Sequence, residues 1–420
     1  MAQVAALEAR LGIPAKTPDN SSMPRRAGRS RPGRPMASRP GRAGRTAAAR
    51  STPTPTAPSP LILPPALPAQ RPSPGTHTPQ MVYDRIELPA IKPDVTRMHL
   101  FGGRYACCGN RSIAGAPTGL DPGSPFGRSV EAMVVCLHYA QGIGLERLRT
   151  VLGEIFGLSV GEGTLSNILA QAQRPLGANT ACIAGDVRAA QVVCSDGTGV
   201  RVAGRSWWKW VFVGAAGVLH LIRPSRGKAV PQEVVGEVRP GVWVSHTFSA
   251  QRGYAERWQM CLTHLLRDTQ FAIDCGDAIL AVPFKRLLLR AIAIGRRRAG
   301  LKDSTLAQDR HDLDRRLDRI MAAHPTNRDG KKLRRRIGRH REHLFIFVTD
   351  RDVPATNDIS ERYLWPSVIF RKITNGFRAE WGAATYAAFR SVVSTAKLNG
   401  NAVLDAIRAV LQNPLNATPG

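Results

Sequence analysis

An aspartate embedded in strand-forming sequence, Asp196, constrains this chain more than any other feature. Residues 191–194 lead into it as an apolar run, and a second run returns through residues 207–213. Runs of β-branched and aromatic residues separated by glycine predict two strands joined by a hairpin, with the turn at Gly197 and Gly199. A carboxylate at the end of a buried strand is unfavourable unless it is paired or binds a cation. The alternative is that Asp196 only caps the turn.

The charge of the chain points to a polyanionic partner. Its 59 lysines and arginines outnumber 31 acidic residues and give a net charge of +28. Such a charge attracts polyanions over long distances, and nucleic acid is the first candidate. Ribosomal, membrane-surface and polyphosphate partners are the alternatives. Seven scattered cysteines argue against a disulfide framework and favour a reducing cytoplasm.

We expect no membrane association, because no apolar stretch is long enough to span a bilayer and residues 1–13 lack the pattern of a signal peptide. Residues 1–80 are predicted to be disordered, since arginines alternate there with Gly, Pro, Ser and Ala, and no acidic residue lies between Asp19 and Asp84. This segment is interpreted as a linker with nonspecific affinity for nucleic acid. A dedicated DNA-binding arm and translation of a shifted reading frame are the alternatives. Residues 412–420 form a tail.

Two further segments precede the strands. Residues 81–126 contain Cys107 and Cys108, which resemble half of a zinc knuckle. Structural zinc sites need four ligands and no second pair lies nearby, so zinc is not expected. Residues 127–185 show helical spacing of apolar residues. They form either a DNA-binding helix-turn-helix or a packing bundle, and the sequence leaves both open.

A helical segment follows the strands. Residues 254–268 are predicted as one amphipathic helix in which Cys261 and His264 lie one turn apart. That pair is either half of a metal site or ordinary packing. Residues at about 279–350 form a very basic helical insertion, and its charge runs are either a solvated face or contacts to phosphates. The candidate DNA-binding residues here and further on are Arg296, Arg297, Arg298, Lys331, Lys332, Arg334, Arg335, Arg336, Arg371 and Lys372.

The order of elements suggests a fold. Three strands, a short helix, a further strand and then helices are the order of a ribonuclease-H-like fold, an α/β core built on a mixed sheet. There, carboxylates on the first strand, at the end of the fourth and on a late helix bind two divalent cations. Mg²⁺ prefers such oxygen ligands, and two ions activate the attacking oxygen and stabilise the leaving one at phosphorus. Asp196 and Glu361 suit the first and last of these positions.

Several motifs together identify a family. They are Leu88-Pro89-Ala90-Ile91-Lys92-Pro93, Gly123 to Gly127, Ser195 to Val202, Ser225-Arg226-Gly227, Cys261 with His264 to Asp268, Asn357 to Arg362, and Pro366 to Lys372. From about Tyr83 to about Leu411 the chain resembles the bacterial insertion-sequence transposases of the DDE class, the group numbered sixty-six.

The resemblance implies a ribonuclease-H-like core at 186–411, with a mixed five-stranded sheet. It implies a transposase that cuts and joins DNA with two Mg²⁺ ions, acting on element ends and target DNA in the bacterial cytoplasm at the nucleoid, as a homo-oligomer on DNA. Asp196 and Glu361 would be catalytic metal ligands. Asn357, Arg362, Cys261 and His264 would support them.

Three positions depart from the family pattern. His246 stands where the family carries its second catalytic aspartate, Gly197 replaces an acid, and Tyr105 replaces a cysteine. An imidazole of ordinary pKa, about 6.5, is neutral near pH 7 and is a poor ligand for Mg²⁺. Two hypotheses therefore stand, an impaired transposase and a catalytically silent DNA-binding remnant of one. A third, a basic nucleic-acid-binding protein without phosphoryl-transfer chemistry, is disfavoured by Asp196 and Glu361.

Overall fold

The computed structural model describes residues 83–117, 120 and 122–412. The segment predicted to be disordered, 1–80, and the tail therefore lie outside the described residues, except for the first residue of that tail, Gln412, which ends the last helix. Residues 83–90 are exposed, form no helix or strand, and belong to a unit distinct from the one that continues from Ile91. A short antiparallel hairpin, β1 (Gly102–Arg104) and β2 (Arg111–Ile113), carries Cys107 and Cys108 exposed at its tip.

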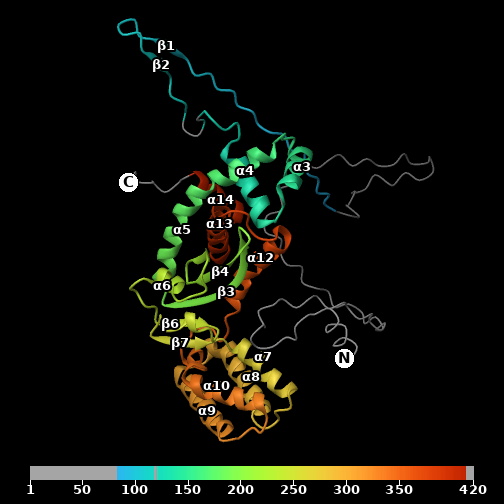
Figure 1. The fold of residues 1–420 in the computed structure, drawn as a ribbon, viewed down its shortest axis with the longest axis vertical. Helices are drawn as coiled ribbons and strands as arrows, with labels where there is room; N and C mark the ends of the chain where they lie inside the picture. The colour runs from blue at the N-terminus through green and yellow to red at the C-terminus, as the bar shows by residue number, and fades with distance from the viewer. Residues whose placement is uncertain (1–82, 118–119, 121, 413–420) are drawn as a thin grey trace, which may run out of the picture. The chain divides into compact units, whose positions relative to one another are not determined.

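A five-stranded mixed sheet forms the centre of the fold (Figure 1). Its order is β5-β4-β3-β6-β7: the first three strands pair antiparallel, and β6 and β7 add in parallel. The strands are β3 (Val192–Val202), β4 (Arg205–Val213), β5 (Val218–Arg223), β6 (Val242–Ser245) and β7 (Arg257–Met260), with α6 (Ala229–Val235) between β5 and β6. This is the mixed sheet predicted from the order of elements, with the fifth strand that the family resemblance implied.

The prediction of a turn at Gly197 and Gly199 is wrong. Strand β3 runs straight through both glycines, which pair with Trp210 and Trp208 on β4, and large aromatic side chains opposite glycine compensate for the missing side chain. The chain reverses instead at Ala203 and Gly204, both with positive φ, as a two-residue hairpin loop requires. Asp196 therefore lies within a strand rather than at its end.

Residues 254–268 are also not one helix. Residues 257–260 form strand β7, paired in parallel with β6, and helix α7 begins only at Leu262 and ends at Asp274. Apolar residues at 258, 261, 262 and 265 fit helical spacing, but pairing with β6 decides the conformation of the first part. The prediction failed because a short edge strand carries too few residues to show an alternating pattern.

Two groups of helices, one before the sheet in the sequence and one at the end of the described chain, cover the sheet. The first group is α2 (Arg128–Val135), a π-helical turn Cys136–Ala140, α3 (Leu145–Phe156), α4 (Glu162–Gln171) and α5 (Gln173–Arg188). The last group is α12 (Asp358–Thr374), α13 (Glu380–Leu398) and α14 (Val403–Gln412). Helix α13 packs against β5 and α5, while α12 packs against β3 and β4 (Figure 1). The first helical group therefore packs against the sheet through α5 and against α14 through α2.

The basic insertion lies between β7 and α12. It contains α8 (Ala281–Arg297), α9 (Asp303–Met321), α10 (Arg328–His340) and α11 (Ile346–Thr349) (Figure 1). Helices α8 and α10 pack against α7, while α9 and α11 pack against α8 and each other. The chain leaves and re-enters the sheet at one place, because Leu262 N donates to Ala355 O at 3.1 Å. Asn357 N donates to Cys261 Sγ at 3.1 Å beside it. We call this junction the insertion root.

A lysine lies inside the core. Lys209 on β4 is 1% exposed, and its ammonium has no hydrogen-bond partner among the described residues, with only the Tyr386 ring 4.6 Å away. Burial, followed by the charge of the buried Arg390, holds the pKa of Lys209 well below its usual value. The unfolded chain then binds a proton that the folded chain does not. The contribution of Lys209 to the free energy of unfolding therefore falls as the pH drops below the ordinary lysine pKa of about 10.4, and this cost is present at pH 7.

We expect Lys209→Met to raise the melting temperature by several degrees at pH 7, because an unpartnered buried polar group costs about 1–3 kcal/mol. The gain should shrink as the pH approaches about 10.4. Thermal denaturation of both proteins at several pH values measures it, with Lys372→Met at an exposed position of α12 as the control. A lower melting temperature for Lys209→Met would show that the lysine stabilises the core.

Candidate active site

Asp196 reaches the site because β3 is longer than its parallel neighbour. Pairing with β6 ends at Cys194 and Val244, so the next residues of β3 run beyond the end of β6. The neighbour Ser195 is held firmly: its hydroxyl accepts hydrogen bonds from Trp243 Nε1 at 2.8 Å and Gln251 Nε2 at 3.0 Å. Asn357 Nδ2 donates to the Ser195 carbonyl at 2.8 Å. These bonds fix the direction of the Asp196 side chain, whose Oδ1 also accepts from Gly197 N.

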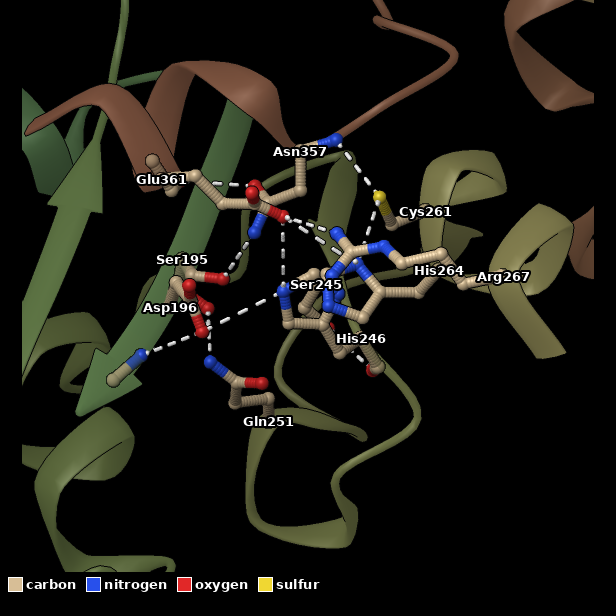
Figure 2. A network of polar contacts seen from close by, with 12 residues as sticks. Ser195, Asp196, Ser245, His246, Gln251, Cys261, His264, Arg267, Asn357 and Glu361 are labelled. Carbon is tan, nitrogen blue, oxygen red and sulfur yellow. Dashed lines mark hydrogen bonds and ion pairs between the residues drawn. The ribbon is translucent and has the colours of Figure 1, made fainter. Parts of the chain in front are cut away.

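His246 follows the last residue of β6 and occupies the centre of the site (Figure 2). Its Nε2 lies 3.6 Å from Asp196 Oδ1 and 3.8 Å from Glu361 Oε1. Glu361 comes from the first turn of α12, one turn after Asn357. The structure therefore brings together the three residues that the sequence placed at the catalytic positions, although they are far apart in the chain.

The protonation of His246 differs from the expectation of a neutral ring. Burial alone lowers the pKa of His246, but hydrogen bonding to Asp196 and Cys261, together with their charges, raises it to about 10. The ring is therefore a cation at pH 7. It places a positive charge between the carboxylates of Asp196 and Glu361.

Helix α7 contributes one more face of the site. Cys261, fully buried, is its N-cap, and its Sγ lies 3.7 Å from His264 Nδ1. The rings of His264 and His246 have centroids 3.5 Å apart. Burial first, and then the charges of His246 and Arg267, lower the pKa of His264 to about 2, so this ring is neutral.

Glu361 lies close to the charged and polar groups from β6 and α7. Its Oε1 lies 3.4 Å from His264 Nδ1 and 3.5 Å from Arg267 Nη2, yet it has no hydrogen bond within the described part of the chain. Burial raises the pKa of Glu361, and the charges of His246 and Arg267 oppose that shift. A buried carboxylate oxygen in this state is a group that a cation would satisfy.

Three residues at the site were not among the sequence candidates. Gln251 and Trp243 position Ser195, and Arg267 reaches Glu361. Arg267 could have been found from the spacing of Cys261, His264 and Arg267, which repeats every third residue of α7. Nothing in the sequence signals Gln251, since its role depends on the short 3₁₀ turn Ser249–Gln251 between β6 and β7.

The basic candidates fall into two groups. Some have structural contacts: Arg298 donates to the carbonyls of Phe347, Val353 and Arg351, and Arg371 donates to Thr198 Oγ1 and the Gly199 carbonyl. Arg336 pairs with Asp268, and Arg334 Nε donates to the Met321 carbonyl. The exposed candidates are Arg296, Arg297, Lys331, Lys332, Arg335 and Lys372, and among them Arg297 pairs with Asp309 at 4.0 Å.

The fold and the site define a class of protein. An acid on the first strand of a mixed five-stranded sheet and an acid on a late helix, converging as they do here, are the arrangement of a ribonuclease-H-like DDE core. Residues 123–385 match the model of the transposase IS66 family. The chain belongs to this family of insertion-sequence transposases, whose members generally use a divalent metal and act on DNA. No curated protein matches the chain. Among the described residues, no helix has the length and apolar character needed to cross a membrane.

Proposed function

We propose that the chain binds the DNA ends of its mobile element and cuts and joins strands there, at a reduced rate. The observation that carries the proposal is the convergence of Asp196 and Glu361 within 4 Å of one nitrogen, His246 Nε2. They come from a strand and a helix that the basic insertion separates in the sequence. This pairing supports a shared cation and has no evident role in core packing.

The residues fit one divalent cation. Glu361 Oε1 is buried and lacks a hydrogen bond among the described groups, and Asp196 Oδ1 and this oxygen both lie within 4 Å of His246 Nε2. Asp196 and Glu361 would hold the ion. When bound, divalent cations activate the attacking oxygen and stabilise the leaving oxygen at phosphorus. A second ion finds a histidine where the family offers a carboxylate, and this is why we propose a reduced rate.

The surrounding cations would hold the DNA backbone. Arg226 lies over the rings of Trp208 and Phe248, 4.5 and 4.0 Å from their centroids, and the charge of Asp196 acts on it. Arg362 is exposed on the helix that carries Glu361. Guanidinium groups bind phosphates in a fixed orientation, so these residues would position the strand against Asp196 and Glu361.

A second candidate function is DNA binding without catalysis. The observation that favours it is the His246 ring itself, which already supplies a positive charge between the two acids at pH 7. Such a protein would occupy element ends and block an active copy from them.

Strand cleavage and joining on DNA that carries the element's end tests the proposal. With Mg²⁺ or Mn²⁺ we expect slow, end-specific cleavage that chelation of the metal stops. The catalytically silent alternative predicts specific binding of the same DNA with no product at any metal concentration. Cleavage that is independent of divalent metal would contradict both.

The exposed basic residues of α10 predict a salt effect. If Lys331 and Arg335 each neutralise a phosphate, Lys331→Gln with Arg335→Gln should reduce the slope of log K against log salt by about 0.9 for each contact. Binding to end DNA measured between low and moderate salt gives the slope. Lys331→Arg with Arg335→Lys keeps both charges and should leave it unchanged. An unaltered slope in the neutralised variant would place the DNA away from α10.

A further inference from the structure

Three side chains at the site have the chemistry and the spacing of ligands for a softer metal than Mg²⁺. One donor atom from each of His246, Cys261 and His264 lies within 4.8 Å of the other two. In a tetrahedral zinc site with bonds of about 2.0–2.3 Å, neighbouring ligand atoms lie about 3.3–3.8 Å apart. Cys261 Sγ and His264 Nδ1 are already 3.7 Å apart.

We propose that His246, Cys261 and His264 bind a transition-metal ion, with zinc as the natural occupant. A thiolate and two imidazoles are the ligands that zinc prefers, whereas Mg²⁺ requires oxygen. His246 is the residue that turns the site toward zinc, because an aspartate there would leave only Cys261 and His264 as soft ligands. This proposal departs from the expectation from the sequence that zinc is unlikely.

Glu361 approaches this site from the side of its two histidines. Its Oε1 lies 3.4 Å from His264 Nδ1 and 3.8 Å from His246 Nε2, close to the separation that two ligands of one tetrahedral ion require. The same oxygen is buried without a hydrogen bond among the described groups. A zinc ion between these residues would satisfy it.

The protein around the ligands is arranged for a thiolate. Cys261 lies at the N-terminus of the thirteen-residue helix α7, where the helix dipole stabilises negative charge. The backbone N–H of Asn357 donates to its sulfur at 3.1 Å, as groups around metal-bound thiolates commonly do. Zinc binds the deprotonated forms of a thiol and two imidazoles, so zinc affinity should fall in acid.

This inference goes beyond the proposed function and is independent of it, since zinc could bind whether or not the chain cleaves DNA. The proposed function and the zinc proposal both involve Glu361. An ion held by His246, Cys261 and His264 would draw Glu361 away from Asp196, and zinc would then oppose Mg²⁺-dependent cleavage.

Metal analysis of the full-length chain tests the site. We expect close to one zinc per chain after dialysis, and a thiolate-to-metal charge-transfer band when Co²⁺ replaces zinc. His264→Ala and His246→Ala should each weaken zinc binding by more than the roughly 10–100-fold typical of losing an outer partner. Cys261→Ser should abolish the charge-transfer band, and circular dichroism shows whether each variant is folded.

The matched control is Cys275→Ser, which removes the exposed cysteine at the opposite end of α7 and should leave zinc content and the band unchanged. Cys107→Ser with Cys108→Ser should also have no effect, as the sequence predicts for these two thiols. Absence of bound zinc in the unmodified chain would overturn the proposal. So would a band that survives His246→Ala and His264→Ala at full affinity, or one that disappears with Cys107 and Cys108.

Discussion

Replacing His246 with aspartate is expected to raise Mg²⁺-dependent strand cleavage about 100-fold. The variant places a carboxylate just after the end of β6, where His246 Nε2 now lies 3.6 Å from Asp196 Oδ1, and so gives a second ion an oxygen ligand. The expected size is the upper end of what outer partners of a metal site contribute, and a direct ligand should contribute at least as much. Cleavage rates on end DNA over a range of Mg²⁺ concentrations measure both the rate and the metal requirement.

His246→Asn is the control for this experiment. It removes the imidazole and its charge without supplying a carboxylate, so it should not reproduce the gain. Equal rates for the unmodified chain and His246→Asp would show that the histidine does not limit catalysis. Equal gains from both variants would show that the ring merely obstructs the site.

Asp196→Asn and Glu361→Gln are each expected to abolish the cleavage that remains, with a loss of at least about 1000-fold. Each change keeps the shape of the side chain and removes the anion that would hold the cation. Residues that act as one unit are not additive, so the double variant should be no worse than either single one. The same losses are expected in the His246→Asp background.

The control lies on the same helix as Glu361. Asp358→Asn changes an exposed acid of the first turn of α12, whose carboxylate accepts only a hydrogen bond from Thr263 among the described residues, and cleavage should persist. End DNA should still bind to both variants, because we propose that arginines and lysines, rather than these two acids, contact the phosphates of the DNA. Persistent cleavage by Asp196→Asn would mean that the chemistry takes place elsewhere.

Much of the core could be predicted because its signals are local. The β-branched runs of β3 to β6 show directly in the sequence, and the motifs around Asp196 and Glu361 identify the family. The turn at Ala203 and Gly204 was not predicted, because the two glycines at 197 and 199 form a pattern that is typical of turns. Only the pairing with Trp208 and Trp210 shows that those glycines lie inside a strand. Strand β7 was missed for the same kind of reason, since its partner β6 decides its conformation.

The protonation and the spacing of the site residues could not be predicted, because they depend on distances between residues far apart in the sequence. From the sequence alone His246 is expected to have an ordinary imidazole pKa, whereas its contacts with Asp196 and Cys261 outweigh burial and raise that pKa to about 10. The closeness of Cys261 and His264 to His246 depends on where α7 begins, with Cys261 as the single residue between the end of β7 and the start of α7. The burial of Lys209 likewise could not be predicted, because it lies in a strand whose neighbouring residues are aromatic and aliphatic.

The insertion root explains how a helical segment of this size can lie between two residues of the candidate active site. Since Leu262 and Ala355 are joined by a hydrogen bond, the insertion begins and ends at one point, and its length need not alter the separation between β7 and α12. The entropy of closing such a loop grows only slowly with its length, by about 0.6 kcal/mol for each doubling. The helices beyond the root can therefore lengthen, shorten or change their charge during evolution as an interchangeable module, while Cys261, Asn357 and Glu361 keep their places.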